Sequence, residues 1–177
     1  SPHHGATLTS EPTTVHRILA IDDDPGSLQV VEAMAAIAGF ELTTSNQPLK
    51  GIELMLEMDP DVVLLDVMMP EITGVELCRQ IKEHPDLRFT PVVLVTALHS
   101  KKDLLKGLEV GCDDFMCKPV DRTILTTRVR SLARVRALTR NLDNAEKVLE
   151  SLARSVEAKD ATTGDHCDRL TRAGILF

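Results

Sequence analysis

The sequence contains no tryptophan and no tyrosine, and only four of its 177 residues are phenylalanine. Proteins that bind single-stranded nucleic acid stack its bases on aromatic side chains, and this sequence has few such side chains. Long hydrophobic runs are also missing. The longest, such as residues 62–65 and 92–95, fall far below the roughly 20 residues that span a bilayer. We therefore expect neither a base-stacking protein nor a membrane protein.

Cysteine is scarce, and its spacing is uninformative for metal or disulfide chemistry. The four cysteines are Cys78, Cys112, Cys117 and Cys167. No CxxC pair and no export signal accompany them, so structural zinc and a disulfide framework are not expected. With 43% hydrophobic residues and a net charge of -7, the composition is that of a water-soluble globular protein. We expect reduced thiols in a cytoplasmic protein.

Charge divides the chain into two parts. Residues 1–120 carry 19 acidic and 9 basic side chains, a net charge of -10, whereas residues 121–177 carry 8 and 11, a net charge of +3. Residues 1–15 are rich in Ser, Thr, Pro and His without apolar periodicity, and we interpret them as a disordered leader or a vector-derived remnant. At about 100–200 residues per domain, the length allows one domain and an appendage.

Short apolar runs alternate with helical periodicity from residue 16 to about residue 120. The runs predict strands over residues 17–22, 40–45, 61–66, 91–96 and 113–117. The segments between them predict helices over residues 27–38, 48–58, 74–83 and 101–110, with Gly39 and Gly111 placed to end two of these. Strict alternation with almost wholly apolar central strands predicts an α/β fold, a doubly wound five-stranded parallel sheet covered on both faces.

A much longer helix is predicted after this sheet, because no glycine or proline occurs between Pro119 and Gly164. Part of it carries a heptad seam, in which apolar residues recur at steps of four and three. The seam consists of Leu138, Leu142, Ala145, Leu149, Leu152 and Val156. We expect residues 122–160 to be a helical coiled-coil linker that pairs with its copy in a homodimer. The alternative is an amphipathic helix that folds back on its own domain.

The heptad phase is not continuous along this helix. Leu125, Val129 and Leu132 have the same spacing, but they reach Leu138 through Val135 in two steps of three. A slip of this kind predicts a local twist or a change of register. It also provides a plausible two-state element for passing a small rotation along the linker.

Polar side chains gather where the predicted strands end. They are Asp22, Asp23, Asp66, Thr96 and Lys118. Since the carboxyl ends of parallel strands share one edge of the sheet, these side chains are expected to lie together. Three adjacent carboxylates raise one another's pKa unless a cation joins them, and Mg²⁺ is a hard cation that suits carboxylates and water. A lysine and a hydroxyl beside them favour an incoming phosphoryl group, which an aspartate can accept covalently.

These residues resemble the receiver domain of two-component response regulators over residues 16–121. The resemblance is carried by the segments ILAIDDDP, LLDVMMPEITGVELC, PVVLVTA and GCDDF and by the Lys118-Pro119 pair, in order and at the expected intervals. It implies a flavodoxin-like (βα)5 fold. It also implies that Asp66 accepts a phosphoryl group from a sensor histidine kinase or a small phosphodonor, and that Thr96 and Lys118 each bind a phosphoryl oxygen.

The same resemblance implies a Mg²⁺ site and a switch. Asp23 would bind the ion directly and Asp22 mostly through water, with Asp66 and the backbone carbonyl of Met68 completing the protein's share. In this family the switch is a population shift in which the Thr96 hydroxyl moves toward the phosphate and the aromatic side chain at Phe115 turns inward.

Apolar side chains at three positions bear on the switch and on the lifetime of a phosphorylated state. Phe115 lacks a hydroxyl, so the hydrogen bond of an inward tyrosine is missing. Met68 and Leu98 occupy the two variable positions beside Asp66, and both are apolar, which leaves an attacking water without a polar guide. We therefore expect slow autodephosphorylation, over many minutes or longer.

The segment that begins near Leu152 resembles the start of HD-GYP domains, metal-dependent phosphodiesterases that act on cyclic di-GMP, and we expect residues 161–177 to be the truncated start of such a domain. The resemblance rests on Asp160, Thr163-Gly164, His166 and Arg169 at matching intervals. It implies that His166 is a first metal-binding histidine and that Arg169 supports it, whereas Thr162 replaces a glutamate that adds a metal ligand in some members. The sequence has no His-Asp and no Gly-Tyr-Pro motif, so we expect a truncated output domain without phosphodiesterase activity in this chain.

Alternative functions are a DNA-binding regulator and a non-phosphorylatable dimerisation adaptor. A basic helical stretch favours the first, formed by Arg122, Arg128, Arg130, Arg134, Arg136 and Arg140. The absence of a following helix-turn-helix argues against direct nucleic acid binding, and the complete acidic site argues against an adaptor. Among the remaining acids, Asp24 is expected at a helix N-terminus rather than on a metal, and Asp113 and Asp114 in solvent.

Overall fold

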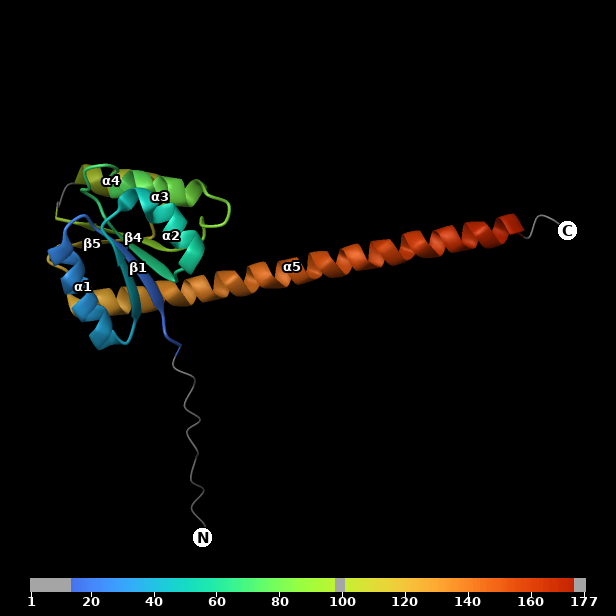
Figure 1. Cartoon of the computed structure of the whole chain (residues 1–177), viewed down its shortest axis with the longest axis horizontal. Coiled ribbons are helices and arrows are strands. Elements are labelled where there is room, and N and C mark those ends of the chain that lie inside the picture. Colours follow the sequence, from blue (N-terminus) through green and yellow to red (C-terminus); the bar gives the residue numbers. More distant parts are fainter. Residues whose placement is uncertain (1–13, 98–100, 174–177) are drawn as a thin grey trace, which may run out of the picture. The chain divides into compact units, whose positions relative to one another are not determined.

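Five parallel strands form the centre of the fold in the computed structural model, which describes residues 14–97 and 101–173 except for the side chains of Asp103 and residues 164–173 (Figure 1). The strands are β1 (Arg17–Ile21), β2 (Glu41–Ser45), β3 (Val62–Asp66), β4 (Val92–Thr96) and β5 (Asp114–Cys117). Their order across the sheet is β2-β1-β3-β4-β5, and every neighbouring pair is parallel.

Helices follow each strand in turn. They are α1 (Pro25–Ala38), α2 (Gly51–Met58) with the preceding 3-10 turn η1 (Pro48–Lys50), α3 (Gly74–Glu83), α4 (Lys101–Glu109) and α5 (Arg122–Ala173). The doubly wound, flavodoxin-like fold that the sequence predicts is confirmed. None of the described helices is both long enough and apolar enough to cross a membrane.

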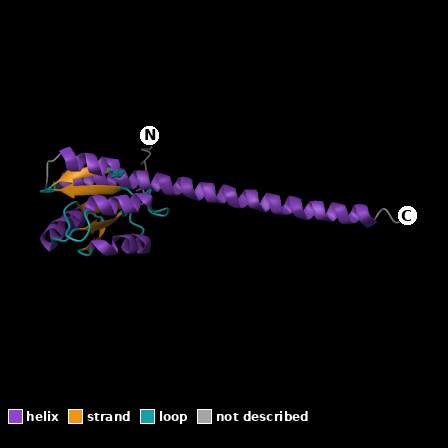
Figure 2. Ribbon diagram, turned by 90° about the horizontal axis from the view of Figure 1, so that it is seen from above, coloured by secondary structure: helices purple, strands orange, loops and turns teal. Residues whose placement is uncertain are grey.

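Two apolar layers cover the sheet because successive side chains of a strand point to opposite faces. On one face, Ile18 and Ala20 of β1 pack with Leu28 of α1 and with the first turns of α5. On the other face, Leu19 and Ile21 pack against α2 and α3. Figure 2 shows the strands lying between these helical layers. The central strands β3 and β4 are buried along their whole length, which explains their unbroken apolar sequence.

Local sequence signals set the ends of several helices. Asp24 caps α1, and its side chain accepts hydrogen bonds from the backbone N–H groups of Gly26 and Ser27. This confirms the expectation that Asp24 is a helix N-terminal acid. Gly39 ends the same helix with a φ of 77°, a left-handed conformation that favours glycine. Asp59 ends α2 in the same region with a φ of 44°, although it is not a glycine.

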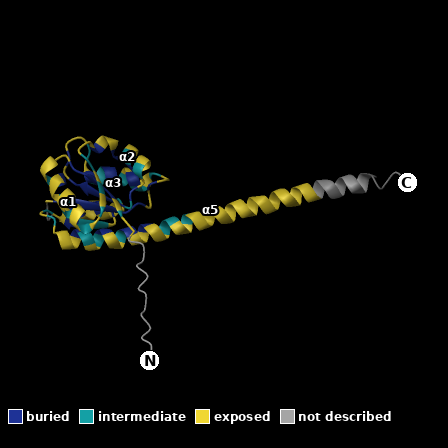
Figure 3. Cartoon of the chain, turned by 60° about the horizontal axis from the view of Figure 1, so that its bottom comes forward, coloured by how far each residue is buried: buried dark blue, intermediate teal, exposed yellow. Residues whose placement is uncertain are grey.

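The chain divides into two units, Ser1–Arg136 and Ala137–Phe177. The first turns of α5 belong to the first unit, and Figure 3 shows buried and intermediate colours along this part of the helix. Leu125, Val129 and Ala133 are buried in the core. Buried Arg136 ends this stretch with an ion pair to Asp59 at 3.3 Å. The first part of α5 is therefore an integral layer of the fold.

The second unit carries an apolar seam that is exposed in the described part of the chain. The exposed fraction is 60% at Leu138 and 72% at Leu142, and the remaining large members are exposed to a similar degree. Val135 is already 54% exposed, although its neighbour Arg136 is buried. Adjacent residues on a helix lie about 100° apart. The slip in the heptad phase therefore falls where the apolar residues change from buried to exposed.

Candidate acidic site

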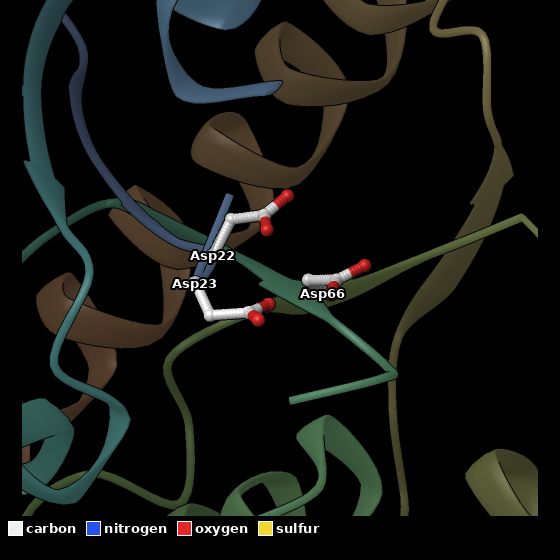
Figure 4. Close-up of side chains that lie close together, drawn as sticks. All are labelled: Asp22, Asp23 and Asp66. Atoms are coloured by element: carbon white, nitrogen blue, oxygen red, sulfur yellow. The ribbon is translucent and has the colours of Figure 1, made fainter. Parts of the chain in front are cut away.

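Three carboxylates meet at the carboxyl edge of the sheet. Asp22 and Asp23 directly follow β1, and Asp66 is the last residue of β3. One carboxylate oxygen from each of the three lies within 4.8 Å of the other two. Figure 4 shows the three side chains reaching into the same space. Asp22 and Asp66 are buried, and Asp23 is exposed to solvent. The sequence prediction that these residues share one site is confirmed in its geometry.

Lys118 joins the cluster from the loop between β5 and α5. Its Nζ lies 2.9 Å from Oδ2 of Asp22 and 3.0 Å from Oδ1 of Asp66. The backbone N–H of Lys118 donates to the carbonyl oxygen of Thr96 at 2.8 Å, and the Lys118-Pro119 peptide bond is cis. One ammonium group thus bridges two buried carboxylates from neighbouring strands.

The environment shifts the pKa of both partners. Burial raises the pKa of Asp66, an effect that the hydrogen bond from Lys118 opposes and the nearby charge of Asp22 reinforces. Burial alone would lower the pKa of Lys118, but its hydrogen bonds to the two carboxylates outweigh this and raise the pKa. Because its pKa is raised, Lys118 is positively charged at neutral pH, and it lies beside three acidic side chains.

This donor set fits a hard divalent cation. Carboxylate and carbonyl oxygens at one solvent-accessible point are the ligands that Mg²⁺ prefers, with water filling the remaining positions. The three carboxylates exceed the charge that Lys118 balances. A bound Mg²⁺ would supply the missing positive charge, and Asp22, Asp23 and Asp66 are the side chains that could hold it.

The other predicted site residues surround the cluster. Thr96 is buried at the end of β4, beside β3, where Asp66 pairs in register with Val95. Met68 has a side chain that is 62% exposed, while its neighbours Val67 and Met69 are buried. Phe115 is half-buried against the core layer that α2 and α3 cover.

Gly74 is a site residue that the sequence analysis missed. A Cβ atom at this position would lie 2.2 Å from the backbone oxygen of Asp66 and 2.9 Å from its carbonyl carbon. The Gly74 N–H also donates to the carbonyl oxygen of Val67 at 3.0 Å. Helix α3 thus begins directly against the end of β3, and only glycine allows this approach. The Thr-Gly pair at the start of a predicted helix is the signal that could have pointed to it.

Asp113 is exposed, as expected, and Asp114 is half-buried, but both carboxylates also have partners in the fold. Asp113 accepts hydrogen bonds from Lys82 Nζ and from the backbone N–H of Val92, each at 2.7 Å. Asp114 forms an ion pair with Arg128 of α5. Asp113 lies directly before β5 and Asp114 is its first residue, and the two carboxylates connect the start of this strand to α3, to β4 and to α5.

Several arginines of the basic stretch on α5 are also engaged within the first unit. Arg128 donates to the carbonyl oxygen of Phe115 as well as to Asp114, and Arg130 lies over the ring of Phe40 at 5.8 Å. Arg136 is buried against Asp59. These three side chains hold α5 to β5, to the end of α1 and to the end of α2.

Some predictions lie outside the described residues. These are Leu98, the leader up to residue 13, and the side chains of His166, Cys167 and Arg169.

Comparison with known proteins points to one family. The family model for the response regulator receiver domain matches residues 18–130. Response regulator PleD from Caulobacter vibrioides is 38% identical over 130 residues, which cover 73% of this chain and 29% of that protein. The DNA-binding dual master transcriptional regulator RpaA from Synechocystis is 34% identical over 118 residues, with coverages of 67% and 49%. This chain therefore spans less than half the length of either relative.

A solved structure gives the same answer for the fold. A putative response regulator from Chloroflexus aurantiacus superimposes with a TM-score of 0.65 at 26% identity, covering 68% of this chain and 99% of that one. Nearly the whole of that protein thus corresponds to the part of this chain that contains the sheet and the acidic site.

Proposed function

This chain belongs to the response regulator receiver family, and we propose that it accepts a phosphoryl group on Asp66 from a sensor histidine kinase or a small phosphodonor. A receiver domain by itself is a phosphoacceptor and not a catalytic enzyme. The observation that carries the proposal is the 3.0 Å contact between Lys118 Nζ and the buried Asp66 carboxylate, beside Asp22 and Asp23.

The chemistry follows from the positions of these groups. An oxygen of the Asp66 carboxylate attacks phosphorus, and a new P–O bond forms as the P–N bond of a phosphohistidine, or the P–O bond of an acyl phosphate, breaks. The bonding electrons leave with the donor group. Lys118 neutralises charge on one phosphoryl oxygen, and the Thr96 hydroxyl donates a hydrogen bond to another.

A Mg²⁺ ion supplies further charge neutralisation when it is bound. Receiver domains bind Mg²⁺ through acidic residues, and here the ligands would be Asp22, Asp23 and Asp66 with the backbone carbonyl of Met68. Asp23 would bind directly and Asp22 mostly through water. The buried pair of carboxylates with one exposed partner suits an ion that keeps part of its water shell.

Intact-protein mass spectrometry tests the proposed reaction. The native chain, incubated with acetyl phosphate and Mg²⁺, should gain the mass of one phosphoryl group. Asp66→Asn should gain none, and chelation of Mg²⁺ should abolish the gain in the native chain. Labelling of Asp66→Asn to the same extent as the native chain would refute the proposal.

Phosphorylation would then switch the last strands through Thr96 and Phe115. The ring of Phe115 packs beside α4, because a Cβ atom at Gly107 would lie 2.3 Å from its Cζ atom. The backbone carbonyl of Phe115 accepts a hydrogen bond from Arg128 of α5. A change in the conformation of Phe115 can therefore act on α5 through this hydrogen bond.

The apolar side chain of Met68, which is 62% exposed beside Asp66, supports slow autodephosphorylation. No polar group at this position would orient a water for attack on the phosphoryl group. The test is the decay of the phosphorylated mass after removal of the donor. A half-life of seconds would contradict the proposal, whereas many minutes or longer would agree with it.

The output that this switch controls is a separate part of the proposal. We assign residues 1–15 to a leader, 16–121 to the receiver domain, 122–160 to a helical linker, and 161–177 to the beginning of an HD-GYP domain. The full-length protein would be a cytoplasmic cyclic di-GMP phosphodiesterase, whereas this chain would not hydrolyse the dinucleotide. Hydrolysis of cyclic di-GMP in the presence of a divalent metal is measured for the full-length protein and for this chain. Hydrolysis by the full-length protein alone would agree with this assignment, and its absence from both would favour another output.

Pairing of the linker with a second copy is supported by the exposed heptad seam of the second unit. Replacing Leu142 and Leu149 by Asp should convert a dimer to a monomer without affecting phosphorylation. Ser151→Asp adds one carboxylate outside the seam, half the charge of the double variant, and should leave the dimer intact. Sedimentation velocity measures the change, and a dimer that survives both seam substitutions would refute this pairing.

A DNA-binding output is the alternative, because the similar protein RpaA is described as DNA-binding. In this chain, however, Arg128, Arg130 and Arg136 are engaged within the first unit. A salt-sensitive shift of duplex DNA at micromolar protein would favour the alternative.

A further inference from the structure

Ser27 lies in the first turn of α1, beside the acidic site, and has no part in the reaction described above. Its side chain is half-buried, and its Oγ atom lies 3.3 Å from Lys118 Nζ. The two residues are 91 positions apart in the chain, so the contact depends on how α1 and the β5–α5 loop meet at the edge of the sheet.

The contact completes the hydrogen bonds of Lys118. An ammonium group has three N–H donors and no acceptor. Here the three acceptors are Asp22 Oδ2 at 2.9 Å, Asp66 Oδ1 at 3.0 Å and Ser27 Oγ at 3.3 Å. The first two are charged and would attract a lysine in many orientations. The third is neutral and comes from a helix, so it adds direction rather than charge.

The Ser27 hydroxyl is itself held in place. It donates to Oδ2 of Asp24 at 2.9 Å, and Asp24 is fixed because it also accepts from the backbone N–H groups of Gly26 and Ser27. With its proton committed to a carboxylate, the Ser27 oxygen presents its lone pairs to Lys118 and becomes a stronger acceptor. A chain of hydrogen bonds thus runs from the cap of α1 to the ammonium group.

We propose that Ser27 is a positioning residue for phosphoryl transfer, which holds the Lys118 ammonium group where the incoming phosphoryl oxygen will meet it. The inference rests on the proposed function of Asp66. When Asp66 becomes phosphorylated, its contact with Lys118 passes to a phosphoryl oxygen, while Asp22 and Ser27 keep the ammonium group in place. A group that is already oriented needs no rearrangement as charge develops.

The test compares Ser27→Ala with Ser27→Thr, which keeps a hydroxyl, and with Ser155→Ala, which removes a serine hydroxyl from the exposed face of α5. Phosphorylation is followed by intact mass at several acetyl phosphate concentrations with saturating Mg²⁺. We expect the maximal rate constant of Ser27→Ala to fall about two- to tenfold, the effect of one hydrogen bond. Ser27→Thr should regain most of the rate, and Ser155→Ala should match the native chain.

Mg²⁺ affinity separates positioning from damage to the site. Because the proposed Mg²⁺ ligands are unchanged, Ser27→Ala should bind Mg²⁺ with the native dissociation constant, measured by calorimetry because the chain has no tryptophan. A native rate constant for Ser27→Ala, a Ser27→Thr variant as slow as Ser27→Ala, or a matching loss of Mg²⁺ affinity would overturn the inference. Failure of the native chain to take up phosphate would instead refute the proposed function of Asp66.

Discussion

Gly74 is the position at which a single methyl group should damage both stability and the acidic site. In Gly74→Ala the new Cβ atom would lie 2.2 Å from the backbone oxygen of Asp66, whereas ordinary contacts begin at about 3.4 Å. The contacted atoms belong to the backbone at the end of β3, so no flexible side chain can move aside. Either α3 or the end of β3 has to shift. Overpacking of this kind costs about 1–3 kcal/mol.

Gly26→Ala provides a matched control. Gly26 also lies in the first turn of a helix beside the site, but a Cβ atom there would meet its nearest neighbour, Oδ1 of Asp24, at 3.5 Å. Replacing glycine by alanine in a helix favours folding by up to about 1 kcal/mol, and this gain applies to either position. Gly26→Ala should therefore be as stable as the native chain or more stable, while Gly74→Ala should be clearly less stable.

Urea and thermal unfolding, followed by circular dichroism at the helical band, measure the difference. Fluorescence is unsuitable because the chain has no tryptophan or tyrosine. A loss of 1–3 kcal/mol in Gly74→Ala corresponds to a fall in Tm of roughly 5–15 °C. The shift should also slow phosphorylation, since the backbone that carries Asp66 has moved. Equal stability of the two alanine variants would refute the steric reasoning.

Three further predictions concern the cap, the thiols and the charge of the site. Asp24→Ala should lower the free energy of unfolding by about 1 kcal/mol, because it removes the cap of α1; urea titration would show an unchanged midpoint if the cap were unimportant. Burial raises the pKa of Cys78 to about 12, so alkylation followed by peptide mapping should label exposed Cys117 quickly and Cys78 only after unfolding; rapid labelling of native Cys78 would contradict its burial. Burial also raises the pKa of Asp66 above its ordinary value of 3.8. Ionised Asp66 therefore lowers the free energy of unfolding at a pH above the raised pKa, and this effect is absent below pH 3.8, where the carboxyl group is protonated in the folded and the unfolded chain. In buffer without Mg²⁺, Asp66→Asn should therefore raise Tm at pH 7 but not near pH 3, and a gain that is independent of pH would count against this explanation.

Much of the fold could be predicted because its signals are local. Unbroken apolar sequence in β3 and β4 indicates strands buried on both faces, and the polar alternation of β2 is typical of an edge strand. The acidic site followed from the same reasoning, since parallel strands bring their carboxyl ends to one edge. Asp22, Asp66 and Lys118 could therefore be placed together although they are far apart in the chain.

The contacts that escaped prediction join side chains across the fold without any local pattern. Lys82 and Asp113 are 31 positions apart, and Arg136 and Asp59 are 77 apart. Charged residues of this kind look like solvated surface in the sequence. Only the folded chain brings Lys82 of α3 to Asp113, just before β5, and Arg136 of α5 to Asp59, just after α2. Ser27 was missed for the same reason. A serine in the first turn of a helix is common, and its contact with Lys118, 91 positions away, cannot be seen in the sequence.

The long helix shows how one pattern can contain two signals. The spacing of Leu125 and Val129 reflects packing on the sheet of the same chain, while the large apolar residues of the seam that begins at Leu138 are exposed. The sequence shows both as a single periodicity with a slip. The difference in burial between the two groups of apolar residues cannot be seen in the sequence.

Chemical trapping of the phosphorylated residue tests the central claim most directly. The chain is incubated with acetyl phosphate and Mg²⁺, treated with borohydride, which reduces an acyl phosphate to the alcohol, and sequenced by mass spectrometry after proteolysis. The account predicts homoserine at position 66 and aspartate at positions 22 and 23. Homoserine at either of those two positions, or an unmodified Asp66 in protein that has gained a phosphoryl group, would contradict it.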